Sequence, residues 1–426
     1  MKKLRYYIIL TTLFFLVIST SSVWPEALQL VKPETVGLSS QRLQRIGNAV
    51  KLEIKKGNIP GAVVLVARKG KVAYFETFGT RDSDKKSPMG KDAIFRIYSM
   101  SKPIVSVAAM ILQEEGKLYL ADPVSKYLPE LGKLNVAVEG ADPKTGEPAV
   151  INTVPSRRDM TVQDLLRHTS GMTYGIFGRS GVKSMYLKAG VETNDQTLDE
   201  MVAKLGKLPL AYQPGAQWEY SRSTDVLGKV IEVASGMTLD RFIETRILRP
   251  LRMESTGFYV KEGKFSRLAE GVKDPRTGRA QPLLDVAKLP KFLSGGGGMV
   301  ATAMDYARFA QMMLNRGQLD GIRIISRKSV ELMTADHLGS AISPSSAFFG
   351  SGYSFGLGFA VRQQTGVSPR YGSPGDFNWG GFAGTYFWVD PKEQLIAVFM
   401  IQDMVRGPLN YYIPIVRSMV YQAIID

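Results

Sequence analysis

The chain has 426 residues, of which 44% are hydrophobic and 22% charged, so it can bury a large core and could form one to three domains. It contains no cysteine, which excludes disulfides, thiol catalysis and cysteine-built zinc sites. Its two histidines belong to no metal-binding motif, so we expect no cofactor and no metal. The net charge of +15 comes from basic residues scattered among acidic ones, so we expect no nucleic-acid partner, while peripheral contact with an anionic envelope surface stays open.

The chain begins with the features of a secretory signal peptide. A basic start, Met-Lys-Lys-Leu-Arg, precedes an apolar run over residues 6–18 that is short for a membrane span. We predict a signal peptide over residues 1–22, cleaved in or just after 19–22, with an uncleaved anchor as the alternative. The protein is therefore expected to be exported, either periplasmic or secreted.

The first regular elements after it are a helix and a β-hairpin. Residues 36–56 place their apolar side chains on one helical face, and the helix is expected to open at Ser39-Ser40. Two apolar runs, over residues 61–67 and 72–78, flank a short turn that ends in glycine. That pattern predicts a hairpin.

The rest of the chain predicts a mostly helical region, followed by a region with a second hairpin. Residues 117–290 are predicted to be mostly helical with long loops, and the stretch 137–158, rich in Pro, Gly and charge, is predicted to be one of those loops. Residues 302–315 predict a further helix with a capping residue at its start. A second hairpin is predicted over residues 383–401, followed by a closing helix over roughly 408–424.

Hairpins near both ends of the chain, with helices between them, indicate an α+β fold. We predict an antiparallel sheet built from both termini and flanked by helices, with an inserted, mainly helical domain. The sheet subdomain would comprise residues 30–98 and 291–426, and the helical subdomain residues 99–290.

Ser99 lies where an extended segment turns into a helix that ends at Gly116. Lys102 follows on the same helical face, close enough to contact the serine hydroxyl. A lysine whose pKa is lowered by burial can activate a serine, and free amides at a helix start favour the oxyanion that forms on attack. Two other Ser-x-x-Lys patterns, starting at Ser83 and Ser180, are expected in loops without a chemical role. On this pattern alone, an ordinary N-cap serine is an equal alternative for Ser99.

Two later clusters carry groups that could serve the same chemistry. Tyr220 follows a Pro-Gly turn and precedes a helix, where a phenol near cations could lose its proton and act as a base. Packing of its ring against Trp218 is the alternative. Residues 377–384 precede a predicted strand, where glycines allow a ligand to approach and an amide can complete an oxyanion hole. A tight turn into an edge strand is the alternative.

Three motifs, Ser99-Met-Ser-Lys102, Tyr220-Ser-Arg222 and Trp379-Gly-Gly381, resemble in order and rough spacing those of class C-type β-lactamases and their relatives. These relatives include penicillin-binding proteins, D-amino-acid peptidases and family VIII carboxylesterases. The likeness extends over about residues 35–420. It implies a β-lactamase/transpeptidase-like fold.

The resemblance also implies a serine hydrolase that works through an acyl-enzyme intermediate on a small-molecule ester or amide. Ser99 would be the nucleophile and Lys102 its proton partner. Tyr220 would be the general base that later protonates the leaving group. The backbone amides of Ser99 and Phe382 would form the oxyanion hole.

Two departures from the family pattern bear on the substrate, which the resemblance would place against Arg222, Trp379, Gly380 and Gly381. Trp379 stands where β-lactamases carry a cation that holds the substrate carboxylate, and tryptophan there resembles the carboxylesterase branch. Arg222 stands where an asparagine is usual, and it could replace the missing charge. We therefore expect a carboxylesterase acting on short- to medium-chain esters. The alternatives are a β-lactamase, a D-alanyl peptidase or penicillin-binding protein, or a non-catalytic cell-wall or penicillin-binding sensor. The oligomeric state is left open.

Two other residues that could be taken for catalytic groups are expected to have structural roles. Ser354 lies in a Gly-x-Ser-x-Gly pattern, but a strand pattern rather than a helix follows it, so an incidental strand serine is expected. His168 has no confident aspartate partner, and it is expected to cap a helix or to support other residues.

Overall fold

The computed structural model describes most of the chain, and the predicted signal peptide and Ser83 lie outside the described residues. The described ranges are 27–82, 86–273, 277–279, 283–340, 342, 348, 350–404 and 408–426.

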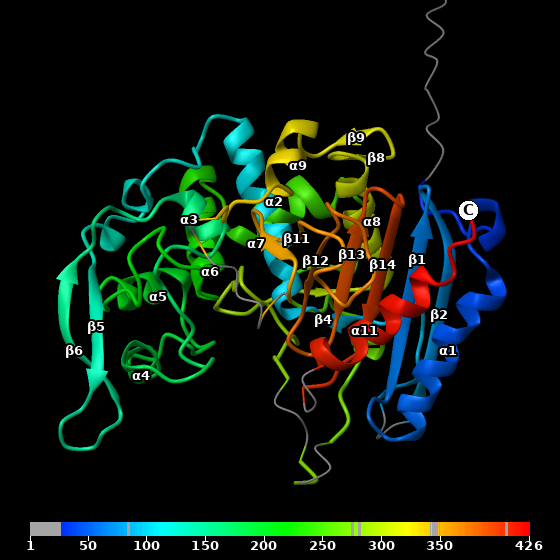
Figure 1. Cartoon of the computed structure of the whole chain (residues 1–426), viewed down its shortest axis with the longest axis horizontal. Coiled ribbons are helices and arrows are strands. Elements are labelled where there is room, and N and C mark those ends of the chain that lie inside the picture. Colours follow the sequence, from blue (N-terminus) through cyan, green and yellow to red (C-terminus); the bar gives the residue numbers. More distant parts are fainter. Residues whose placement is uncertain are drawn as a thin grey trace, which may run out of the picture.

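An eight-stranded antiparallel sheet forms the centre of the molecule, in the order β10-β11-β12-β13-β14-β1-β2-β3 (Figure 1). The central strand β1 pairs with its hairpin partner β2 on one side and with β14 on the other, where Leu65 lies opposite Val398. The sheet is therefore built from both ends of the sequence, as predicted, and both predicted hairpins form. The strands are β1 Gly61–Arg68, β2 Lys71–Asp82, β3 Ser87–Pro88, β10 Tyr353–Phe355, β11 Ala360–Arg362, β12 Phe377–Gly380, β13 Tyr386–Asp390 and β14 Leu395–Met400.

Helices cover both faces of this sheet, which explains why all eight residues of β1 are buried. Alternate residues of a strand point to opposite faces. On one face, Val64 and Val66 pack with α1 (Ser40–Lys55) and α11 (Pro408–Tyr421), which Figure 1 shows side by side. The opposite face packs on α8 (Ala303–Leu314). The α+β prediction is confirmed.

A mainly helical region lies beside the sheet, and the long helix α2 (Ser101–Glu114) connects the two. Every residue of α2 from Ser101 to Leu112 is buried, so this helix forms the centre of the core and positions what lies at its start. The predicted subdomain boundaries stay predictions. The other helices are α3 Val162–Leu166, α4 Gly181–Lys188, α5 Leu198–Leu205, α6 Ser223–Ser235, α7 Leu239–Ile243 and α9 Arg327–Met333. Short helical turns are η1 Pro33–Val36, η2 Tyr98–Met100, η3 Val124–Lys126, η4 Pro129–Leu131, η5 Glu244–Leu248 and η6 Phe265–Arg267. Short strands are β4 Phe95–Arg96, β7 Val300–Ala301, β8 Gln318–Leu319 and β9 Ile322–Arg323.

The prediction of a loop over residues 137–158 is wrong. Strands β5 (Asn135–Ala141) and β6 (Pro148–Pro155) form an antiparallel hairpin there, which projects at the far side of the helical region in Figure 1. β6 contains four β-branched residues and β5 two valines, which favour strands in spite of the local Pro and Gly content. The Asp142 carboxylate accepts hydrogen bonds from the amides of Lys144 and Thr145, and this closes the turn between the strands.

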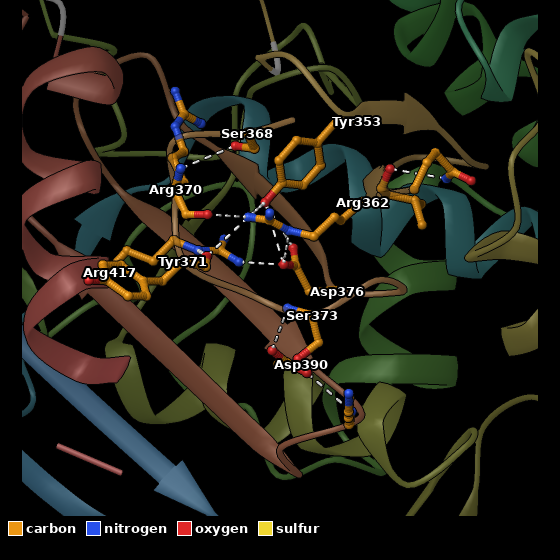
Figure 2. A network of polar contacts seen from close by, with 12 residues as sticks. Tyr353, Arg362, Ser368, Arg370, Tyr371, Ser373, Asp376, Asp390 and Arg417 are labelled. Atoms are coloured by element: carbon orange, nitrogen blue, oxygen red, sulfur yellow. Dashed lines mark hydrogen bonds and ion pairs between the residues drawn. The ribbon is translucent and has the colours of Figure 1, made fainter. Parts of the chain in front are cut away.

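A buried network of charged side chains joins the outer strands to α11 (Figure 2). Asp376 Oδ2 accepts hydrogen bonds from Arg362 Nε at 2.7 Å and from Arg417 Nη2 at 2.6 Å. The Tyr353 hydroxyl donates to the other carboxylate oxygen at 3.1 Å. All of these side chains are buried, so one carboxylate compensates two guanidinium groups out of contact with water. The network fixes α11 against β10 and β11.

Across the part of the chain that the structure describes, no helix combines the length and the apolar character that crossing a membrane requires.

Candidate active site

Ser99 lies in the helical turn η2, between β4 and the start of α2. The residue before it, Tyr98, has φ of +43°, a left-handed conformation that is strained for a residue with a side chain. The Ser101 hydroxyl donates to the Tyr98 carbonyl at 2.7 Å, and this bond holds the turn. Ser99 therefore faces a cavity from a strained turn, two residues before the start of the buried helix α2. The sequence predicted a helix start at this point.

Lys102 reaches from α2 to the Ser99 hydroxyl. Its Nζ lies 3.4 Å from Ser99 Oγ, 3.2 Å from the Tyr174 hydroxyl and 2.6 Å from the Gly296 carbonyl oxygen. The side chain is almost completely buried. Three polar contacts thus hold the amine next to the serine in an enclosed site.

Burial lowers the pKa of Lys102 to about 7, because an ammonium group loses its hydration there. The carboxylate of Asp225 acts in the opposite direction, and the guanidinium of Arg222 lowers the pKa further. A substantial share of Lys102 is therefore uncharged at neutral pH. Such an amine can accept the proton of Ser99.

Tyr220 lies on the other side of Ser99, with its ring over Lys102 Nζ at 4.5 Å. Its hydroxyl is buried beside Ser99 and the indole nitrogen of Trp379, without a hydrogen bond of ordinary geometry to either. The expectation that nearby cations lower the pKa of Tyr220 is wrong in direction. Burial raises that pKa, and the contacts with Ser99 and Trp379 offset only part of the effect. Tyr220 is therefore a neutral phenol that can donate or relay a proton, and its ring also stacks on Trp218, as in the alternative interpretation.

The turn between β12 and β13 brings the third motif against the Ser99 segment. A Cβ atom on Gly381 would lie 2.2 Å from Thr385 Oγ1 and 2.4 Å from the Ile97 carbonyl oxygen, so only glycine fits there. The next residue, Phe382, lines the same cavity as Ser99. Its ring contacts Tyr98 with centroids 6.2 Å apart.

Trp379 and Gly380 lie at the end of β12, behind the described lining of the cavity. The Trp379 ring packs against Tyr220 at 5.7 Å and against Phe355 at 5.2 Å between centroids. Gly380 pairs with Tyr386 of β13. The indole therefore shapes the site through Tyr220, at the place where the sequence comparison with β-lactamases expects a cation.

Arg222 lines the cavity, but its charge is already compensated. Its Nη2 lies 2.5 Å from Glu192 Oε2, and its Nη1 lies 3.2 Å from Asp225 Oδ2. The structure therefore does not support the hypothesis that Arg222 supplies a free cation for a substrate carboxylate.

Sequence reasoning missed four contributors to the site, namely Tyr174, Glu192, Asp225 and Gly296. A Cβ on Gly296 would lie 2.7 Å from Asp225 Oδ2, so the glycine allows the backbone to approach that carboxylate closely. Asp225 Oδ1 accepts hydrogen bonds from the Ser294 hydroxyl at 2.6 Å and from the Gly296 amide at 2.9 Å. No local pattern distinguishes Tyr174 or Glu192.

The structural roles expected for Ser354 and His168 agree with the structure. Ser354 lies within β10, and its hydroxyl donates to Asp336, with no helix following it. His168 is buried with Nδ1 3.1 Å from Ser221 Oγ, and its ring lies 5.0 Å from that of Tyr220. Burial holds the pKa of His168 well below its usual value, so this neutral ring supports Tyr220 from behind.

Ser180 differs from its prediction, because it caps helix α4 instead of lying in a loop. Its hydroxyl accepts a hydrogen bond from the Lys183 amide, while the Lys183 ammonium lies 3.0 Å from a Glu219 oxygen. Its position among glycines obscured a helix start. The lysine is turned away from Ser180 and toward a carboxylate.

The cavity in front of Ser99 has a volume of about 940 Å³, which is enough for a drug-sized molecule. Apolar side chains form much of its wall, among them Ile176, Phe177, Leu284, Leu289, Phe292 and Met404. Within the described ranges, no group of three or more metal-ligating side chains could hold an ion.

The chain is similar to several known proteins. A sequence model of the Beta-lactamase family matches residues 44–415. Protein Rv1367c of Mycobacterium tuberculosis is 35% identical over 356 residues, covering 81% of this chain and 86% of the relative. Esterase EstB of Burkholderia gladioli is 28% identical over 390 residues, covering 86% and 92%.

Solved structures show the same fold. EstCE1, described as a hydrolase with promiscuous acyltransferase activity, superposes with a TM-score of 0.76 at 26% identity, covering 89% of this chain and 99% of that one. A class C beta-lactamase superposes with a TM-score of 0.65 at 18% identity, covering 90% and 97%. Because the family match spans most of the sequence, this chain belongs to the Beta-lactamase family of serine hydrolases.

Proposed function

We propose that this protein is a carboxylesterase that hydrolyses short- to medium-chain esters of small molecules through an acyl-enzyme on Ser99. The observation that carries the proposal is the buried Lys102 amine, 3.4 Å from the Ser99 hydroxyl and with a pKa of about 7. A protein that only binds its ligand does not need a buried lysine, partly uncharged at neutral pH, next to a serine hydroxyl.

The proposed reaction assigns a step to each of these groups. Uncharged Lys102 accepts the Ser99 proton as Oγ bonds to the ester carbonyl carbon, and the amides of Ser99 and Phe382 stabilise the resulting oxyanion. The neutral Tyr220 phenol donates its proton to the departing alkoxide, and Lys102 returns the proton that it took to the tyrosine. Water then repeats the sequence on the acyl-enzyme and releases the acid.

Esters are favoured over β-lactams and D-alanyl peptides because the two motif positions at which the carboxylate of those substrates would be expected to bind offer no free cation. Trp379 occupies the cation's place, and Arg222 is already paired with two carboxylates. The esterase EstB among the relatives supports the same choice. The basic and apolar start of the sequence supports export as the location of this activity.

A fluorophosphonate probe tests the nucleophile, and a panel of a p-nitrophenyl ester, a cephalosporin and a D-alanyl peptide tests the substrate class. We expect the probe on Ser99, fast turnover of the ester, and loss of both in Ser99→Ala. Ser354→Ala is the matched control and should keep its rates within a few-fold. Labelling of Ser354 would overturn the site, and preference for the cephalosporin would overturn the esterase assignment.

A further inference from the structure

Arg222 lies at the centre of a buried group of charges in the cavity wall. Besides its two carboxylate contacts, its guanidinium lies over the Tyr174 ring, 5.0 Å from the centroid. Glu192 Oε1 also accepts a hydrogen bond from the Gly175 amide at 2.7 Å. The arginine therefore touches Glu192, Asp225 and Tyr174 at once. Both of its terminal nitrogens are paired with carboxylates, while its Nε is buried without a hydrogen-bond partner.

These contacts connect Arg222 to Lys102 through two short routes. Asp225 holds the Gly296 amide, and the carbonyl of the same glycine accepts a hydrogen bond from Lys102 Nζ at 2.6 Å. Tyr174, whose ring supports the guanidinium, has its hydroxyl 3.2 Å from the same Nζ. The position and the electrostatic surroundings of the amine thus depend on how Arg222 and Asp225 are arranged.

The groups that face Lys102 come from several elements. Tyr174, Tyr220 and His168 surround it. The two phenols are neutral at pH 7, and burial raises their pKa values further, while burial holds the pKa of His168 well below its usual value. Formal charges come only from Asp225, Arg222 and the more distant Glu192, among the described side chains near the amine. Asp225 favours the ammonium form of Lys102, and Arg222 opposes it.

We propose that Arg222 is a positioning residue that screens the Asp225 carboxylate from Lys102, keeping the amine free to act as the base for Ser99, and that it is not a receptor for a substrate anion. The inference rests on the proposed role of Lys102 in the esterase reaction. It gives a function to the arginine that departs from the family's usual asparagine.

The test is the pH dependence of Ser99 labelling by a fluorophosphonate, since this readout requires no knowledge of the natural substrate. In Arg222→Gln, the pH of half-maximal labelling should rise by at least about one unit, so labelling at pH 6 should slow about tenfold while the rate at high pH is kept. Glu192→Gln should move the midpoint in the opposite direction, because it removes a negative charge. The double variant Arg222→Gln/Asp225→Asn should restore the wild-type midpoint. Arg222→Lys should keep the pH of half-maximal labelling close to the wild-type value.

Lys229→Gln is the matched control, because it removes a cation of the same helix that pairs with Asp199 and Glu232 outside the cavity. An unchanged midpoint in Arg222→Gln, or an equal loss of rate at every pH, would overturn the inference. An Arg222→Gln variant whose only change is a higher KM for an anionic substrate would also overturn it. If Arg222→Gln does not fold, the downward shift in Glu192→Gln decides the question. If Ser99 of the wild-type protein is not labelled at any pH, the proposed function itself is wrong. If Ser99 is labelled but the midpoint does not respond to Arg222→Gln, only the inference about Arg222 is wrong.

Discussion

The pH dependence of ester hydrolysis follows directly from the state of Lys102. The catalytic form is the uncharged amine, and its share of the population rises with pH. With a pKa of about 7, half of the enzyme is competent at pH 7, and only about a tenth at pH 6. We therefore expect kcat/KM to rise about tenfold between pH 6 and pH 8 and to level off above that.

Replacing Lys102 by arginine tests whether the rise of kcat/KM with pH is caused by the lysine. A guanidinium keeps the positive charge but does not give up its proton in this pH range. Lys102→Arg should therefore show no rise of kcat/KM with pH, and it should lose about 10²–10⁴-fold relative to the wild-type plateau above pH 8, the usual contribution of a positioned base. The assay is initial-rate hydrolysis of p-nitrophenyl butyrate from pH 5 to pH 9 at constant ionic strength, with circular dichroism as the check on folding.

The reasoning would be refuted by a wild-type rate that stays flat down to pH 5. It would also be refuted by a folded Lys102→Arg enzyme that keeps more than about a tenth of its activity. Either result would mean that another group takes the Ser99 proton.

Three further changes probe separate parts of the structure. Tyr220→Phe removes only a hydroxyl, so kcat should fall about 10²–10⁴-fold with an unchanged thermal midpoint, as measured with the same ester. Trp379→Lys should shift kcat/KM toward a cephalosporin relative to the ester, since a charge-assisted bond to a carboxylate is worth roughly 1.5–3 kcal/mol. Asp376→Asn leaves Arg362 and Arg417 buried without a counter-charge, and urea titration should show a loss of about 3–5 kcal/mol in unfolding free energy.

Each of these expectations has a clear contrary result. A less than threefold loss in Tyr220→Phe would mean that the tyrosine only packs. A Trp379→Lys enzyme that favours esters as strongly as wild type would remove the tryptophan from the explanation of specificity. Asp376→Asn with wild-type stability would mean that water or another group compensates the two arginines.

Features set by local patterns were predictable from the sequence. Apolar runs on either side of short turns predicted the β1–β2 and β13–β14 hairpins, and the change from extended to helical pattern at Ser99 marked the start of α2. The hairpin at residues 135–155 was missed because its proline and glycine content masked a β-branched pattern.

The electrostatics of the site were not predictable, because burial is a property of the folded chain. The pKa of Tyr220 rises although cations lie near, since its hydroxyl loses contact with water. The pairing of Arg222 with Glu192 joins residues from separate elements, and no motif contains both. For the same reason, the sequence presented Arg222 as a free charge.

The pairing of β1 with β14 has a consequence for how the chain acquires its structure. During synthesis, β1 is made early, yet the strand that covers one of its edges and the helix α11 that covers one of its faces come last. Until then, a strand that is fully buried in the finished protein exposes an open edge, which is a template for aggregation. Contacts between such distant segments also slow folding. A cell that makes this protein must therefore keep the early hairpin from pairing with other chains until the final strand is available.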